Sequence, residues 1–125
     1  MPVASWYERF VEATDEILSP LLKELGFTPM NPQRLRNTAY MRRYKSPSKE
    51  LEILFEVREG LTDIYLHYEH NNELRKIRFA NYLVQKHGET VRSRVDPARQ
   101  DMRPMLFSWR QIVDEYRADL AEPSL

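Results

Sequence analysis

Two histidines and the acid between them are the residues whose types could bind a metal ion. His67, Glu69 and His70 carry imidazole and carboxylate groups, which are common metal ligands. We expect them at the end of a β-strand, where alternate side chains point to opposite faces, so His70 would face away from the other two. No third ligand stands at a spacing typical of metal sites. The sequence therefore favours a structural His67 paired with Glu52, and it predicts no metal and no cofactor.

Groups that could catalyse a reaction are sparse. The chain has no cysteine, no G-x-S-x-G motif and only three glycines, too few for a phosphate-binding loop. Carboxylates are paired on one face of a predicted hairpin, Glu52 with Glu56 and Glu56 with Asp63. On a solvated face such pairs are ordinary surface charges, so the sequence predicts no enzyme. A raised pKa of Glu56 would instead favour acid–base catalysis.

A stretch of basic and aromatic residues is the strongest candidate for a binding site. From Thr28 to Lys49 the sequence holds six basic residues and no acid. Basic groups that bind phosphates, beside rings that stack on bases, are what a platform for single-stranded nucleic acid requires. The candidate binding residues are Arg34, Arg36, Tyr40, Arg42, Arg43 and Tyr44.

The alternative interpretation gives this stretch a structural role, and we favour it. Tyrosines are common in strands, and one or both would pack against a helix. The chain has 19 basic and 19 acidic residues and no net charge, so its overall field indicates no nucleic-acid partner. In this interpretation the arginines form ion pairs with acids of the helices, namely Glu8, Glu12, Asp114 or Glu115.

The elements that position these residues centre on a β-hairpin predicted over residues 51–68. Apolar and polar residues alternate along both of its halves, which is the period of a half-buried strand. Glycine adopts positive φ at little cost, so the turn is expected at Glu59-Gly60. That turn would place Phe55 opposite Ile64.

The segments around the hairpin extend it into a meander. Residues 38–45 are predicted to form a preceding strand, whereas residues 28–37, with two prolines, are predicted to be a loop. Asn71-Asn72 could be a type I′ turn before a fourth strand at 73–78, or it could begin a helix. We favour the strand because it continues the meander.

Three helices are predicted outside the sheet. Ser5 and Glu8 form a capping box before an apolar stripe that predicts a helix up to a Schellman ending at Gly26. Within it, Pro20 would either kink the helix or begin a second segment. A second helix is predicted over 79–87. A third is predicted over 102–120, with Asp101 as its N-cap.

These patterns predict a single α+β domain over residues 1–125. Its sheet would be a three- or four-stranded antiparallel meander, with an N-terminal helix and two C-terminal helices packed on one face. No apolar run approaches the roughly 18 residues of a membrane span, and the N-terminus does not resemble a signal peptide, so we expect a cytoplasmic protein.

The capped helix, the Gly-Phe ending, the meander and the closing helices together form an arrangement that resembles small bacterial proteins, some of them toxin-neutralising immunity proteins. The resemblance is one of arrangement and transfers no site residue. The most consistent function is a small non-enzymatic module that binds an unknown protein partner. Nucleic-acid binding through the Arg/Tyr strand is the alternative, and a homodimer is compatible with the sequence.

Overall fold

A computed structural model describes residues 5–98 and 101–125, and it shows an α+β fold built on an antiparallel sheet. The sheet has six strands, in the order β1-β3-β4-β5-β6, with β2 also paired to β3. The strands are β1 (Thr28–Pro29), β2 (Gln33–Arg36), β3 (Ala39–Lys45), β4 (Lys49–Glu56), β5 (Leu61–His70) and β6 (Glu73–Arg78).

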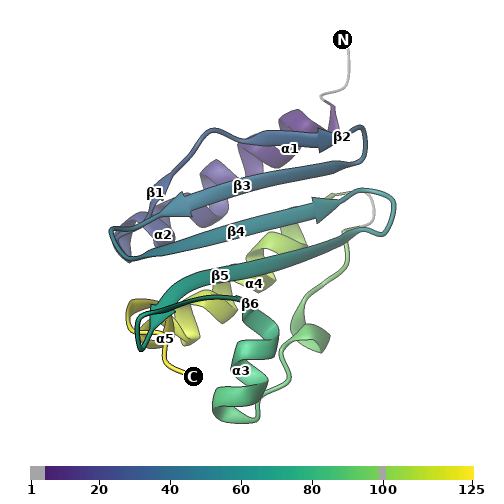
Figure 1. The fold of residues 1–125 in the computed structure, drawn as a ribbon. Helices are drawn as coiled ribbons and strands as arrows, with labels where there is room; N and C mark the ends of the chain where they lie inside the picture. Colours follow the sequence, from purple (N-terminus) through teal and green to yellow (C-terminus); the bar gives the residue numbers. More distant parts are fainter. Residues whose placement is uncertain (1–4, 99–100) are drawn as a thin grey trace.

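Helices cover one face of this sheet and leave the other uncovered. Figure 1 views the sheet from its uncovered side, with α1, α2, α4 and α5 behind it and α3 beyond the β6 edge. The helical elements are α1 (Trp6–Ala13), the π-helical η1 (Thr14–Leu18), α2 (Ser19–Glu24), α3 (Phe79–His87), the 3₁₀ turn η2 (Arg92–Arg94), α4 (Arg103–Glu115) and α5 (Arg117–Ala121). None of the helices in the described ranges is both long and apolar enough to cross a bilayer.

The sheet is larger than the three or four strands predicted, because residues 28–37 are not a loop. They contain β1 and β2, which both pair with β3 at the edge of the sheet. An edge strand tolerates proline, since the missing N–H would have pointed to solvent, and Pro29 pairs there with Tyr44. Prolines were therefore a misleading signal for loop structure in this segment.

The central hairpin forms, but its register differs from the prediction by two residues. Ile53 pairs with Ile64, and Phe55 pairs with Thr62 rather than Ile64. The cause is a four-residue loop, 57–60, in place of a tight turn at Glu59-Gly60. A shift of two residues keeps every side chain on its predicted face, so the assignment of the core face is unaffected.

Gly60 is the last residue of that loop, and two features of the structure require a glycine there. Its φ is +62°, a left-handed conformation that glycine adopts without steric cost. In addition, a Cβ atom at this position would lie 2.3 Å from the carbonyl oxygen of Ala98. The Ala98 N–H donates a 3.0 Å hydrogen bond to the Gly60 carbonyl, which fastens the hairpin loop to the segment before α4.

The fourth strand at 73–78 and its type I′ turn are confirmed. Asn71 and Asn72 both have positive φ, of 53° and 64°, as a type I′ turn requires. The resulting β6 pairs with β5 along its full length, so the meander continues as predicted.

The N-terminal helix begins and ends as predicted but differs in the middle. Ser5 accepts a hydrogen bond from the Glu8 N–H, and Phe27 N–H donates to the Leu22 carbonyl in a Schellman ending. Around Pro20 the chain neither restarts with a new cap nor stops. Instead η1 widens the helix by a π turn, which accommodates the proline.

The C-terminal helices also differ in part from the prediction. α3 spans Phe79–His87 and ends at Gly88, as expected. The helix predicted over 102–120 is interrupted at Tyr116, whose φ and ψ of −107° and 30° separate α4 from α5. Met102, rather than the predicted Asp101, is the N-cap residue, although the Asp101 carboxylate accepts the Arg103 N–H at 3.0 Å.

The core lies between the sheet and these helices. Phe55 of β4 is fully buried and stacks on Phe10 of α1, with ring centroids 6.1 Å apart. The aromatic stripes of the first and last helices contribute Phe10 and Trp109 to this core rather than to a surface groove. Burial of large apolar side chains stabilises the fold by about 1.5–3 kcal/mol each.

Candidate functional site

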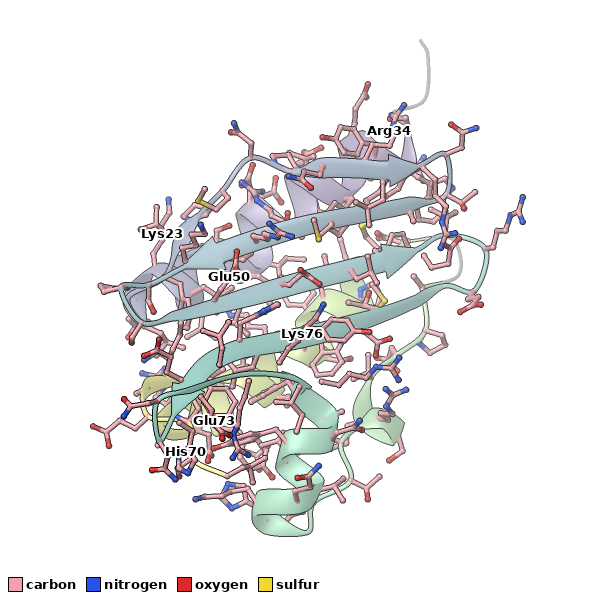
Figure 2. The ribbon with its side chains drawn as sticks, viewed as in Figure 1. Lys23, Arg34, Glu50, His70, Glu73 and Lys76 are labelled. Carbon is pink, nitrogen blue, oxygen red and sulfur yellow. The ribbon has the colours of Figure 1, made fainter. Side chains whose placement is uncertain are left out.

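The uncovered side of the sheet, which we call the open face, is the main candidate for a functional surface. It carries the odd-numbered residues of β3 and β5 and the even-numbered residues of β4 and β6. Figure 2 shows these side chains toward the viewer, Glu50 and Lys76 among them. Antiparallel sheets often leave one face in water, so an open face is not in itself a site.

Charged residues cross the open face in two rows of paired positions. One row runs from Arg43 through Glu52 and Tyr65 to Arg78. The next row places a lysine, a glutamate, a histidine and a lysine side by side: Lys45, Glu50, His67 and Lys76. In each row an acid lies near the middle and a base lies at each end.

Glu52 is at the centre of this arrangement. Its carboxylate lies 3.5 Å from Arg43 Nε, 3.7 Å from His67 Nε2 and 3.8 Å from Lys76 Nζ. Only 8% of its side chain is exposed, although no helix covers this face. A charged group that is shielded from water is costly unless it is paired, and Arg43 and Lys76 supply the pairing charges. His67 and Glu52 are in contact, as predicted, but as diagonal neighbours, because the strand partner of His67 is Glu50.

In the ion pairs of the open face, the basic side chains are more exposed to solvent than the acidic ones. In the ion pairs of Arg36, Arg43 and Lys76 the basic side chain is between 44% and 74% exposed. The acids that they bind are between 8% and 21% exposed. The carboxylates therefore form the floor, and the basic groups are what a molecule approaching the centre of this face meets first.

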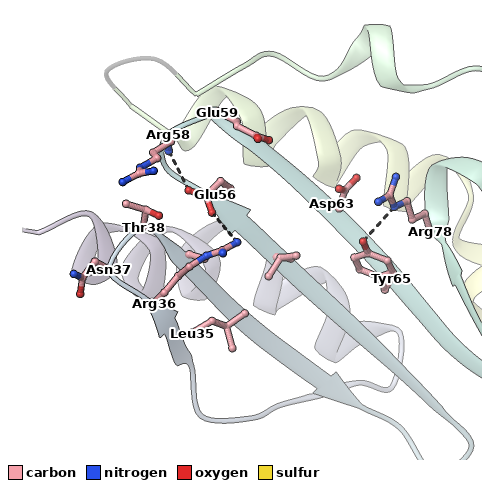
Figure 3. A pocket seen from close by; sticks show the side chains of 12 residues that line it. Leu35, Arg36, Asn37, Thr38, Glu56, Arg58, Glu59, Asp63, Tyr65 and Arg78 are labelled. Atoms are coloured by element: carbon pink, nitrogen blue, oxygen red, sulfur yellow. Dashed lines mark hydrogen bonds and ion pairs between the residues drawn. The ribbon is translucent and has the colours of Figure 1, made fainter.

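A recess of about 810 Å³, which we call the hollow, lies at the end of the open face nearest the hairpin loop. Leu35, Ala39 and Leu54 give it an apolar floor, and Tyr65 adjoins them. Figure 3 shows Arg58, from the loop, and Arg78, from β6, on opposite sides of it. Its volume is within the range of pockets that hold small ligands or anchoring side chains.

Two carboxylates of the hollow, Glu56 and Asp63, each have an arginine partner. Glu56 lies 3.4 Å from Arg36, and the pKa of its carboxyl group is lowered, chiefly by a hydrogen bond from Thr38 and also by the Arg58 backbone N–H. A proton donor at neutral pH needs a raised pKa, so this shift is opposite to the one that would favour acid–base catalysis. Asp63 is bound by Arg92 at 3.1 Å.

The guanidinium of Arg78 has a different environment. Its Nε donates a 3.2 Å hydrogen bond to the Tyr65 hydroxyl, which raises the pKa of Arg78, with a further contribution from the nearby charge of Asp63. A hydroxyl neutralises no charge, and the Asp63 carboxylate is already bound by Arg92. Arg78 therefore presents positive charge to the hollow.

Three of the six predicted binding residues lie on the covered face. Tyr40, Arg42 and Tyr44 share a face, as predicted, but that face packs against α1 and η1. Tyr40 and Tyr44 are 4% and 0% exposed, so their rings cannot stack on bases in this fold. Arg42 binds Thr14 Oγ1 at 3.0 Å and Asp15 at 2.5 Å.

The other three predicted residues are exposed but do not converge. Arg34 lies over the ring of Tyr7, with 4.8 Å between the guanidinium carbon and the ring centroid, on the helix side of the sheet. Arg36 and Arg43 are on the open face. The structure thus divides the predicted platform between two faces.

The acids expected to neutralise these arginines were assigned wrongly. Arg42 pairs with the helix residue Asp15, and Arg36 and Arg43 pair with glutamates of β4. The expected acids were Glu8, Glu12, Asp114 and Glu115. The difference follows from strand geometry, because alternate residues of β3 point away from the helices and can reach only the neighbouring strand.

The histidines do not form a metal cluster with their neighbours. His67 and His70 are on opposite faces of β5, as predicted. Within residues 5–98 and 101–125, no three His, Asp or Glu side chains gather in a way that could hold a metal ion.

No motif in the sequence indicates the hollow. Its Leu35, Arg58 and Arg78 come from β2, a loop and β6, and none of them was singled out. One signal was present: Leu54 interrupts the otherwise polar residues on its face of β4.

Comparisons of the chain with protein-family models, with curated proteins and with solved structures give no match. The fold and the open face are therefore the basis of the functional argument.

Proposed function

We propose that this chain is a small non-enzymatic module that binds a partner protein through the open face of its sheet. The observation that supports this most is the hollow, with its apolar floor on a face that no helix covers. Leu35, on that floor, is 50% exposed. Exposed apolar groups within a polar surround are typical of protein-binding surfaces.

The charged groups of the open face are suited to binding a partner rather than to catalysing a reaction. The recessed carboxylates of the open face, Glu50, Glu52 and Glu56, are paired with bases, and Glu56 has a lowered pKa. These groups are arranged as fixed charges, which give specificity and orientation to an interface. Nucleic-acid binding through Arg34, Arg36 and Arg43 is the second candidate, supported by the exposure of these three side chains.

Affinity capture with two matched variants tests the proposal. Leu35→Arg places a bulky charge on the floor of the hollow, and Phe107→Arg makes the same change on the exposed side of α4, where Phe107 is 48% exposed. Extract of the source cells, with and without nuclease treatment, is passed over wild type and both variants.

We expect a stoichiometric partner protein on wild type and on Phe107→Arg, and its loss on Leu35→Arg. Retention on Leu35→Arg would contradict the placement of the site. Capture that depends on intact nucleic acid, and disappears after nuclease treatment, would support the second candidate instead.

A further inference from the structure

We propose that the open face binds an acidic segment of its partner protein, with an apolar side chain of that segment in the hollow. Carboxylates on either side of the apolar residue are bound by Arg58 and Arg78. This inference rests on the proposed function and adds the chemistry of the partner.

At the centre of the open face, acidic side chains are less exposed to solvent than basic ones. Formal charges on the open face nearly balance, but Glu52 at its centre is 8% exposed whereas Lys76 beside it is 54% exposed. Exposed acids occur at the two ends, at Glu69 and at Glu59, which lines the hollow and follows Arg58 in the loop. A partner that covers the centre therefore meets positive charge, and acidic groups on the partner complement it.

The side chains of the two arginines beside the hollow, Arg58 and Arg78, are able to bind a further carboxylate. Glu56 accepts the Arg58 backbone N–H, but its carboxylate is bound by the side chain of Arg36. Within the described parts of the chain, no carboxylate forms an ion pair with the guanidinium of Arg58 or Arg78. Each retains N–H groups that can form charge-assisted hydrogen bonds with a carboxylate.

The shape and lining of the hollow fit an apolar side chain. Its floor of Leu35, Ala39 and Leu54 offers no charged group, and it lies between Arg58 and Arg78 (Figure 3). A residue with an apolar side chain fits the floor, and acidic neighbours in the same segment reach the arginines. A central apolar anchor surrounded by polar contacts is the usual organisation of an interface hot spot.

The same features favour a protein over a nucleic acid. Tyr65 is the aromatic ring of the open face, and it is already occupied by Lys76 at 4.9 Å and Arg78 at 5.7 Å from its centroid. Bases would have no free ring on which to stack.

The test is an NMR titration of the ¹⁵N-labelled full chain with three capped five-residue peptides. Their sequences are Glu-Glu-Leu-Glu-Glu, Lys-Lys-Leu-Lys-Lys and Gln-Gln-Leu-Gln-Gln. We expect the acidic peptide to shift the amide signals of Leu35, Leu54 and Tyr65 and to bind at least tenfold more tightly than the other two. Added salt weakens its binding, because the contacts are electrostatic.

Two double variants show which arginines carry the binding. Arg58→Glu/Arg78→Glu should weaken the acidic peptide at least tenfold. Lys23→Glu/Arg110→Glu makes the same change in net charge at exposed residues of α2 and α4 and should leave its affinity unchanged. Thermal melting of both variants confirms that they are folded.

Several results would overturn the inference. These are equal binding of the lysine peptide, shifts confined to residues outside the hollow, or equal weakening by the two double variants. Tighter binding of a single-stranded oligothymidylate at the same residues would assign the face to nucleic acid. The capture experiment separates the two proposals. If a protein partner is captured and is lost on Leu35→Arg, but the acidic peptide does not bind, the proposed binding function stands and only the acidic nature of the partner is refuted.

Discussion

Replacement of Gly60 by alanine tests how the hairpin loop beside the hollow is held in place. Two costs add at this position. The residue has a φ of +62°, where a Cβ atom costs roughly 1–2 kcal/mol. The new Cβ would also lie 2.3 Å from the Ala98 carbonyl oxygen, so the backbone must move and the 3.0 Å Ala98–Gly60 hydrogen bond is weakened, at a cost of about 1 kcal/mol.

Gly88 provides the matched control. Its φ of +70° is close to that of Gly60, yet no atom lies within 4 Å of the position that its Cβ would take. Gly88→Ala should therefore show only the conformational cost. We expect a loss of about 1–2 kcal/mol in the free energy of unfolding for Gly88→Ala, and of about 2–3 kcal/mol or more for Gly60→Ala.

Urea denaturation followed by circular dichroism measures the difference. With a slope of about 2 kcal/mol per molar urea, 1 kcal/mol moves the midpoint by about 0.5 M. Equal midpoint shifts for the two variants would refute the claim that the Ala98 backbone restrains the loop. The result bears on the site, because this loop carries Arg58.

Three further predictions concern the fold. Phe55→Asp should abolish cooperative thermal unfolding, because it removes a fully buried ring worth about 3–5 kcal/mol and buries a carboxylate. Leu74→Asp, at a side chain 79% exposed, should melt like wild type, and a normal melt for Phe55→Asp would contradict the core assignment. Burial raises the pKa of Tyr44 in the folded state, so its contribution to stability is complete below the ordinary tyrosine pKa of about 10 and falls as the pH rises above it. Tyr44→Phe should lose less stability than wild type between neutral and strongly alkaline pH, and equal losses in urea titrations would contradict this. Asn72→Ala should lower stability by about 1 kcal/mol at its φ of 64°, whereas Asn72→Gly should not, and a thermal melt that ranks them the other way would contradict the type I′ turn.

Features of the fold that depend on a few neighbouring residues were predictable from the sequence. The Ser5 cap, the Schellman ending at Gly26 and the Asn71-Asn72 turn each require particular residues at fixed spacings, and all three are present. The alternation in β4 and β5 likewise fixed which side chains share a face. Local geometry determines these features, so no knowledge of the packed structure is needed.

Features that depend on contacts between distant segments were not predictable in the same way. The hairpin closes through a four-residue loop, and the last residue of that loop, Gly60, is hydrogen-bonded to Ala98, which is far away in sequence. Alternation along β3 placed Tyr40, Arg42 and Tyr44 together, but it could not identify theirs as the covered face, because the opposite face also carries apolar residues. Tertiary packing decides which face the helices cover.

The candidate site was predictable only in its charges. Arg36 and Arg43, from the basic stretch 28–49, do lie on the open face. The hollow, however, joins residues of β2, β3, β4, β5, β6 and the loops between them. β2 lies within a segment predicted to be a loop, so the position of Leu35 on the floor could not be inferred. A binding surface assembled from so many separate segments leaves no motif in the sequence.

Site-specific photo-crosslinking in the source cells tests most directly whether the open face contacts a partner. A benzophenone amino acid replaces Leu35 of β2 in one variant and Phe107 of α4 in the other, two positions of nearly equal exposure. Figure 1 shows α4 behind the sheet. The account predicts one discrete protein adduct from position 35 and none from position 107. An adduct from position 107 alone, or the same adducts from both positions, would contradict it.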